Sequence, residues 1–249
     1  MKNLLSKHIL RQSMRNNWKL WLALVAIACI QAAAVAGFAG REITDPAKML
    51  FLLGNAVFEG TLMVMIIVFS LTAGNGLVVR EVDRGTMCFT LNTPITRRQI
   101  ILSKALFFIA AIIVLTLVVG TITNIILVAV GKDGMFGRFW LMILNFLVWA
   151  FAISGICFCS SCWFNKNAYA MTVSTAFLVL FFITKTMSNI KNFEFLQYFS
   201  LNSLFDANGI ANGTISTAFA IISVVVLFAI GTVLYAVGIN KFLKKDLPL

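Results

Sequence analysis

The stretch from Ala105 to Val130 reads ALFFIAAIIVLTLVVGTITNIILVAV and contains no charged residue. A helix needs about 20 consecutive apolar residues to cross the hydrocarbon core of a bilayer. This run has that length, and its apolar residues are continuous rather than spaced as one stripe of an amphipathic helix. It therefore predicts a membrane-spanning helix.

Five other apolar runs of similar character occur along the chain. With the first run they define six predicted spans: Leu20–Gly40, Met49–Val79, Ala105–Val130, Phe139–Phe164, Ala168–Thr184 and Ile215–Ile239. The composition agrees, because 60% of the residues are hydrophobic and only 12% are charged, too few charges for the surface of a soluble domain. No connecting segment is long enough to fold separately. We therefore expect residues 1–249 to form one all-α integral membrane domain.

The Lys and Arg residues indicate how the chain is oriented. Most of the 20 basic residues lie before the first span, between the second and third spans, or at the end of the sixth. Basic residues in short loops are retained on the cytoplasmic side, so we expect both termini in the cytoplasm and an outer segment at residues 185–214. The net charge of +11 then follows from topology and contact with anionic lipids, and it does not indicate nucleic-acid binding.

The sequence carries little catalytic chemistry. His8 is the single histidine, so a histidine-based triad or metal site could exist only around that N-terminal residue. Gly131 and Lys132 lack the other residues of a phosphate-binding P-loop. We predict that this chain has no catalytic residue, no metal ligand and no ATP-binding loop of its own.

The most informative connecting segment, which we call the elbow, spans residues 80–104 and reads REVDRGTMCFTLNTPITRRQIILSK. Apolar residues among charges predict a short surface helix over Glu81–Leu91, ended by the turn at Pro94. Thr96 and Gln99 have the spacing of a capping box, which predicts a new helix that continues into the third span. The elbow is thus expected to be ordered, although its arginines would also mark an ordinary cytoplasmic loop.

The elbow resembles the signature of the ABC-2 type permeases, the membrane subunits of ATP-binding-cassette exporters. That signature is a glutamate, then Gly-Thr, then Leu-x-x-Pro-x-x-Arg, then a lysine at the foot of the third helix. The matching residues here are Glu81, Gly85, Thr86, Leu91, Pro94, Arg97 and Lys104. The six-span layout and the basic N-terminal lead-in are also similar, so the resemblance covers most of the chain.

This resemblance implies an ABC-2 exporter fold and a division of labour between subunits. Two permeases, identical or homologous, would form the pathway in a bacterial plasma membrane. Two cytoplasmic ATPase subunits would bind ATP and magnesium and dock on the elbow, so this chain would need no cofactor of its own. The implied coupling residues are Glu81, Arg84, Gly85, Thr86, Leu91, Pro94 and Arg97.

The cargo is indicated only by layout. The compact chain is similar to permeases that export bacteriocins and lantibiotics for immunity, or toxin-like peptides such as phenol-soluble modulins, which implies amphipathic peptides or hydrophobic compounds as cargo. The alternative is a channel or secondary transporter that needs no ATPase partner. An ATPase subunit encoded beside this chain or purified with it would favour the exporter.

Glu59 is the candidate pathway residue, because a carboxylate inside a predicted span is costly and often functional. Two structural alternatives remain open. Glu59 could pair with Lys48 or Lys185, or it could lie near the outer headgroups because the run Met49–Val79 exceeds the bilayer core. A break at Gly74–Gly76 would shorten that helix.

Overall fold

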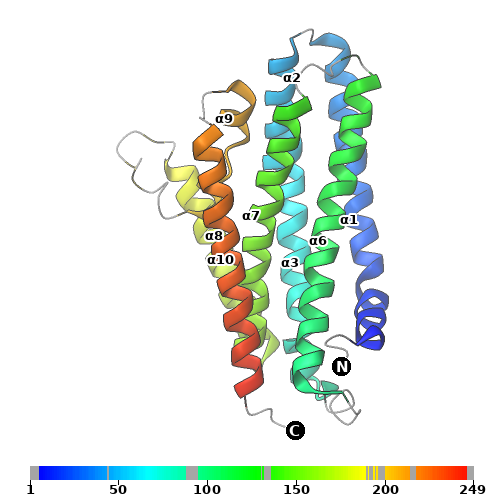
Figure 1. Cartoon of the computed structure of the whole chain (residues 1–249), viewed down its shortest axis with the longest axis vertical. Coiled ribbons are helices and arrows are strands. Elements are labelled where there is room, and N and C mark those ends of the chain that lie inside the picture. Colours follow the sequence, from blue (N-terminus) through cyan, green and yellow to red (C-terminus); the bar gives the residue numbers. More distant parts are fainter. Residues whose placement is uncertain are drawn as a thin grey trace.

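A computed structural model shows the chain as a bundle of long helices that lie side by side along one axis (Figure 1). It describes residues 6–43, 45–87, 95–129, 131, 136–188, 190, 193, 195, 200–213 and 217–245. Within these ranges almost every residue is helical and no strand occurs. The predicted all-α class is therefore confirmed.

The helices follow the chain in a simple up-and-down order. They are α1 (Lys7–Glu42), α2 (Pro46–Leu53), the π-helix η1 (Gly54–Leu62), α3 (Met63–Leu77), α4 (Val79–Asp83), α6 (Arg97–Ala129), α7 (Phe136–Trp163), α8 (Asn167–Ser188), the 3-10 helix η4 (Leu201–Leu204), α9 (Ala207–Asn212) and α10 (Thr217–Lys244). In the described part of the chain, six segments are long and apolar enough to cross a membrane: α1, the continuous series α2–η1–α3, α6, α7, α8 and α10. This confirms the predicted number of membrane helices.

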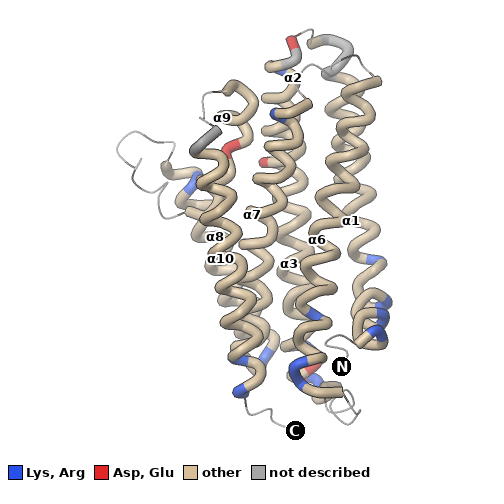
Figure 2. The backbone as a smooth tube through the Cα atoms, viewed as in Figure 1, with Lys and Arg blue, Asp and Glu red and all other residues tan. Residues whose placement is uncertain are grey.

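The bundle has two chemically different ends. α1 begins and α10 ends at the same end of the bundle (Figure 1). Lys and Arg residues are found mainly at that end, while the middle of the bundle carries few charged residues (Figure 2). The weakly charged middle suits the hydrocarbon core of a bilayer, where a helix hydrogen-bonds its own backbone N–H and C=O groups.

The first helix extends well beyond its predicted apolar core. α1 has 36 residues, which corresponds to about 54 Å at about 1.5 Å per residue, longer than a hydrocarbon core of about 30 Å. Its N-terminal turns expose Lys7, Arg11 and Arg15 and bury Ile9 and Ser13. This charged extension belongs to the basic end of the bundle.

The centre of the bundle is α7. Of its most apolar stretch 78% is buried, compared with 17% for α8. Its Phe146 packs edge-to-face against Phe58 of η1, with ring centres 5.6 Å apart, and against Phe205 of the outer segment at 5.3 Å. The fully buried Trp149 donates from its indole nitrogen to the Asn202 side-chain oxygen at 3.0 Å. Aromatic packing therefore fills the middle of one chain.

The closest helix packing joins α7 to α10. A Cβ atom at Gly231 would lie 2.5 Å from the Phe151 ring, so only glycine permits this approach. Small residues at such crossings let helices pack closely in a membrane. The Phe151 ring also stacks on Tyr235, with centres 5.1 Å apart, and the Tyr235 hydroxyl is 2.8 Å from the Ser154 hydroxyl. α10 is therefore firmly attached to the central helix.

The second span differs from a simple helix in two places. The chain forms the π-helix η1 over nine residues at Gly54–Leu62. The possible break at Gly74–Gly76 is wrong, because α3 continues through these residues to Leu77. The interruption lies at Val78, whose φ of −121° and ψ of −70° separate α3 from α4.

Candidate functional site: the elbow between α3 and α6

The elbow begins with a short helix and a tight turn. The predicted helix Glu81–Leu91 is wrong in its extent, because α4 ends at Asp83. The backbone then closes a turn, in which the Gly85 N–H donates to the Val82 carbonyl at 3.0 Å. Gly85 has a φ of +70°, a left-handed conformation that glycine adopts without strain. Leu91 and Pro94 lie outside the described residues.

The second half of the elbow starts a long helix as predicted. The Thr96 N–H donates to the Gln99 side-chain oxygen at 3.0 Å, and the Gln99 N–H donates to the Thr96 hydroxyl oxygen at 3.3 Å. These reciprocal bonds are a capping box, and α6 begins at Arg97. The predicted helix start is therefore confirmed.

An ion pair joins the two halves of the elbow. The Lys104 ammonium group lies 2.5 Å from a Glu81 carboxylate oxygen and also donates to the carbonyl of Leu77, the last residue of α3. The Lys104 side chain is only 2% exposed and that of Glu81 20%. A charge so deeply buried is tolerated when it is paired and hydrogen-bonded. The pair therefore fastens α4 and the end of α3 to α6.

Side chains of α7 and α8 also hold the elbow. At the interruption between α3 and α4, the Val79 N–H donates to the Ser161 hydroxyl of α7 at 3.1 Å. At the other end of α4, the Asn167 N–H, at the first residue of α8, donates to the Asp83 carboxylate at 3.3 Å. Movement of α4 would therefore be transmitted to α7 and α8.

The start of α1 and the end of α10 reach the α6 half of the elbow. The Ser6 N–H, just before α1, donates to the buried Ser103 hydroxyl at 2.9 Å. The Arg97 guanidinium donates to the carbonyl of Lys245, just after α10, at 3.4 Å. Together with the contacts to α7 and α8, these bonds make the elbow the place where most of the long helices are connected.

The turn between α4 and Met87 presents a polar outer face. Arg84, Gly85 and Thr86 are exposed, while Val82 and Met87 point into the core. The apolar residues anchor the turn, and the exposed ones are free to meet another molecule. Among the candidate coupling residues that the structure describes, Glu81 is thus committed to an internal ion pair, whereas Arg84–Thr86 and Arg97 are exposed.

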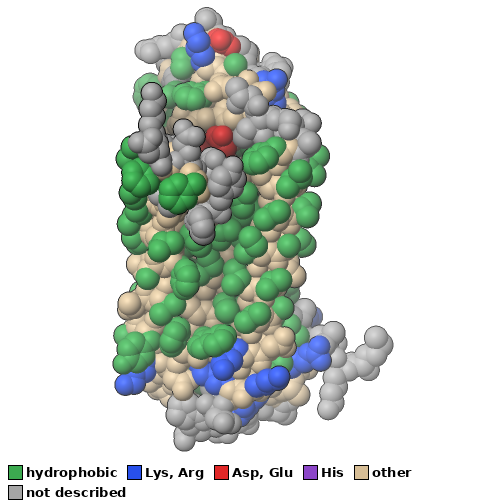
Figure 3. Space-filling model, turned by 90° about the vertical axis from the view of Figure 1, so that its left-hand side faces the viewer, with side chains coloured by type: hydrophobic (Ala, Val, Ile, Leu, Met, Phe, Trp, Pro, Cys, Tyr) green, Lys and Arg blue, Asp and Glu red, His purple; other side chains and the backbone are tan. Residues whose placement is uncertain are grey.

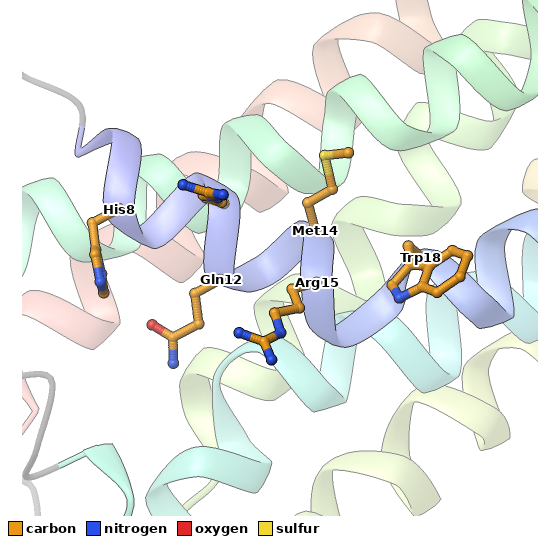
Figure 4. Close-up of a pocket in the computed structure, with 6 residues that line it drawn as sticks. His8, Gln12, Met14, Arg15 and Trp18 are labelled. Atoms are coloured by element: carbon orange, nitrogen blue, oxygen red, sulfur yellow. The ribbon is translucent and has the colours of Figure 1, made fainter.

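One cavity lies beside this exposed turn, and a second lies along α1. One, of about 420 Å³, separates α1 from the elbow. Its lining includes Gln12, Ser13, Asn16 and Asn17 of α1 and Arg80, Glu81, Arg84 and Thr86 of the elbow. The other, of about 620 Å³, is lined on α1 by His8, Arg11, Gln12, Met14, Arg15 and Trp18. Figure 4 shows His8, Gln12 and Arg15 projecting from one side of α1 and Met14 from another.

The candidate pathway residue Glu59 lies at the opposite end of the bundle from the elbow. The π-helix η1 places its carboxylate 3.4 Å from the Lys185 ammonium group of α8. The same carboxylate accepts a hydrogen bond from the Ala207 N–H, at the start of α9, at 3.0 Å. Lys185 also donates to the Phe205 carbonyl at 3.2 Å. The sequence offers Lys48 and Lys185 as possible partners of Glu59, and the structure pairs it with Lys185.

Sequence reasoning missed several residues of these sites. Lys104 was recognised only as part of a motif, and its pairing with Glu81 was not predicted. Ser161 and the uncharged polar residues of α1 that line the smaller cavity, such as Gln12 and Asn16, carried no signal, because single polar residues near helix ends are common. The π-helix around Glu59 has no characteristic sequence pattern.

The fold and the charge distribution define a polytopic membrane protein with an ordered basic end. The sequence profile described as ABC-2 family transporter protein matches residues 5–247, nearly the whole chain. The chain therefore belongs to this family and is a membrane component of an ATP-binding-cassette transporter. A comparison with curated proteins gave no match.

Family membership has direct consequences for the complex. Members are the membrane components of their transporters and are not themselves the catalytic subunits. They associate with ATP-binding-cassette ATPase subunits and with the membrane. The elbow is the part of this chain that best combines an exposed polar face with bonds to several spans.

Proposed function

We propose that this chain is the permease subunit of an exporter and that separate ATPase subunits dock on the exposed face of its elbow. Both termini and the elbow would lie in the cytoplasm of a bacterial cell, and cargo would move outward across the plasma membrane. The cytoplasmic placement rests on the basic end of the bundle (Figure 2) and the retention of basic residues on that side.

The observation that carries this proposal is the set of bonds around the elbow. The exposed residues Arg84–Thr86 directly follow α4, whose Glu81 is paired with the buried Lys104 of α6. An ATPase that pushes on the turn would therefore move α4 and α6 together. Arg97 would take part by linking the start of α6 to Lys245.

The docking surface would extend onto α1. The cavity of about 420 Å³ is lined by polar residues of both α1 and the elbow, and Gln12 lines this cavity and the neighbouring one. A surface built from Arg11, Arg15 and Arg84 favours an acidic or polar segment of the ATPase. ATP and magnesium would be held by that partner, since this sequence has no phosphate-binding loop.

The cargo pathway would lie between two permeases rather than within one. Aromatic packing around Phe146 and Trp149 fills the centre of a single bundle. A second copy, identical or homologous, would then supply the other wall. Amphipathic peptides or hydrophobic compounds suit such a membrane-embedded path, and a role in antimicrobial-peptide immunity would follow from peptide export.

Glu59 would act on the outer part of this pathway. By pairing with Lys185 and holding the Ala207 N–H, it fastens the segment before α9 to the second span. Release of cargo would require this contact to loosen. Glu59 is thus proposed as a residue that controls the exit.

The test is transport by reconstituted vesicles that contain the chain and its ATPase subunit. We expect labelled amphipathic peptide to move only when ATP is present on the ATPase side, and we expect the chain alone to hydrolyse no ATP. Cargo movement by the chain alone, without ATP, would instead favour the channel or secondary transporter.

A further inference from the structure

A groove on the side of the bundle is enclosed by α7, α8 and α10. It has a volume of about 580 Å³, within the range of about 300–1,000 Å³ typical of small-molecule sites. Nearly all of its lining is apolar, and representative residues are Phe164, Val173, Phe177, Ile230 and Leu234. In a membrane-spanning chain this groove lies among the spans and suits a hydrocarbon ligand.

One end of the groove meets a group of lysines. Trp163 and Phe164 line this end, where α7 finishes. The Lys241 ammonium group lies 4.7 Å from the centre of the Trp163 ring. The Lys245 ammonium group donates to the Phe164 carbonyl at 2.6 Å. Burial lowers the pKa of Lys245, and the nearby charge of Lys241 also lowers it, while Cys162 acts in the opposite direction.

Two more lysines complete the cluster. Lys166 follows Phe164 closely in the chain, Lys244 is in the last turn of α10, and both are exposed. Within the described ranges, none of the four lysines forms a salt bridge, although Asp83 accepts a hydrogen bond from the neighbouring Asn167. Figure 3 views this side and shows apolar side chains over the middle with Lys and Arg along the lower border.

We propose that the groove binds an anionic phospholipid, with one acyl chain between α8 and α10 and the phosphate group among Lys166, Lys241 and Lys244. The groove supplies the apolar surface that an acyl chain needs. The lysines lie where a headgroup would emerge, and cation clusters beside spans attract anionic lipids. Trp163, exposed and in contact with Lys241, suits the interface between acyl chain and headgroup.

A second copy of the chain fits this face less well than a lipid. Copies inserted in the same direction are related by an axis along the membrane normal, so a two-fold contact brings residues of equal depth together. A dimer through this groove would place one lysine cluster beside the other, which is unfavourable. The lipid site uses none of the residues of the exposed turn Arg84–Thr86, so it does not depend on the proposed coupling role.

The test measures which lipid the full-length chain retains. The purified protein is re-lipidated with equal amounts of phosphatidylglycerol and phosphatidylcholine, and bound lipids are counted by native mass spectrometry. Wild type should retain phosphatidylglycerol preferentially. The combined variant Lys166→Gln, Lys241→Gln and Lys244→Gln should lose about tenfold or more of this preference, because three cationic contacts are removed.

Two controls separate the site from general charge and general hydrophobicity. The variant Lys7→Gln, Arg11→Gln and Arg15→Gln removes the same charge from exposed positions of α1 and should keep the preference. Val173→Phe should reduce lipid retention by filling the groove, whereas Val179→Phe, exposed on the same helix outside the groove, should not.

Three results would overturn the proposal. The first is equal retention of the two lipids by the wild type or an unchanged preference in the Lys166, Lys241 and Lys244 variant. The second is displacement of the lipid by soluble glycerol phosphate, which would show a site for free anions. The third is efficient cross-linking of two copies by the variant Ile230→Cys, which would show that a second permease covers the groove.

Discussion

The ammonium group of Lys104 lies 2.5 Å from the carboxylate of Glu81, although the two residues are 23 positions apart in the chain. Lys104 also holds the carbonyl of Leu77. The last turn of α3, the short helix α4 and the start of α6 are therefore one mechanical unit. This unit lies directly behind the exposed turn at Arg84–Thr86.

The first prediction concerns the stability of this ion pair. Lys104→Met should destabilise the chain by about 3 kcal/mol, because it leaves the partly buried Glu81 carboxylate without its counter-charge. The double variant Lys104→Met and Glu81→Leu should be less destabilised than the sum of the single variants. Unfolding in detergent measures the four free energies of the cycle, with exposed Arg98→Gln as the control. Additive effects would show that the pair does not fasten the helices.

The second prediction concerns the turn at Gly85. No atom lies within 4 Å of a Cβ built there, but φ is +70°, so Gly85→Ala introduces backbone strain rather than a clash. We expect a loss of about 1 kcal/mol and weaker stimulation of the ATPase. Gly85→Asn should be milder, because asparagine tolerates this conformation better.

Gly137 provides the matched control for Gly85. A Cβ built at Gly137 would also meet open space, but this residue lies in the helix α7 and has no positive φ. Gly137→Ala should therefore be neutral or slightly stabilising. Equal losses from the alanine variants at the two positions would contradict the role assigned to the turn.

The third prediction concerns the contact between Glu59 and Lys185. Glu59→Gln keeps an oxygen for the Ala207 N–H but removes the charge, and Lys185→Gln removes the other half of the pair. If the pair fastens the exit segment, both variants and their combination should change the export rate by a similar factor. The rates are compared at matched membrane abundance. A slower rate for cationic cargo in Glu59→Gln alone would instead indicate direct contact with cargo.

The features that were predictable from sequence are the local ones. The apolar run Ala105–Val130 is long enough to define a span by itself, and Thr96 and Gln99 form a capping box because they are three residues apart. Spans of this kind depend on composition rather than on distant contacts.

The features that were not predictable depend on tertiary contacts or on backbone detail. Glu81 meets Lys104 only because the fold brings α4 within reach of α6, and Val79 meets Ser161 only because α3 ends beside α7. The helix predicted over Glu81–Leu91 is interrupted because Gly85 takes a left-handed conformation. Glycine occurs both within helices and after their ends, so its presence alone did not locate that turn.

The central claim is that the exposed turn of the elbow transmits force from the ATPase, and charge reversal at Arg84 tests it most directly. The measurement is cargo-stimulated ATP hydrolysis by the reconstituted complex, compared between wild type, Arg84→Glu and the control Lys48→Glu. Lys48 is exposed on α2, at the opposite end of the bundle. We predict that Arg84→Glu lowers stimulated hydrolysis at least about tenfold, equivalent to about 1.4 kcal/mol of lost interaction, and that Lys48→Glu has no effect. Wild-type hydrolysis and transport in Arg84→Glu would contradict the claim.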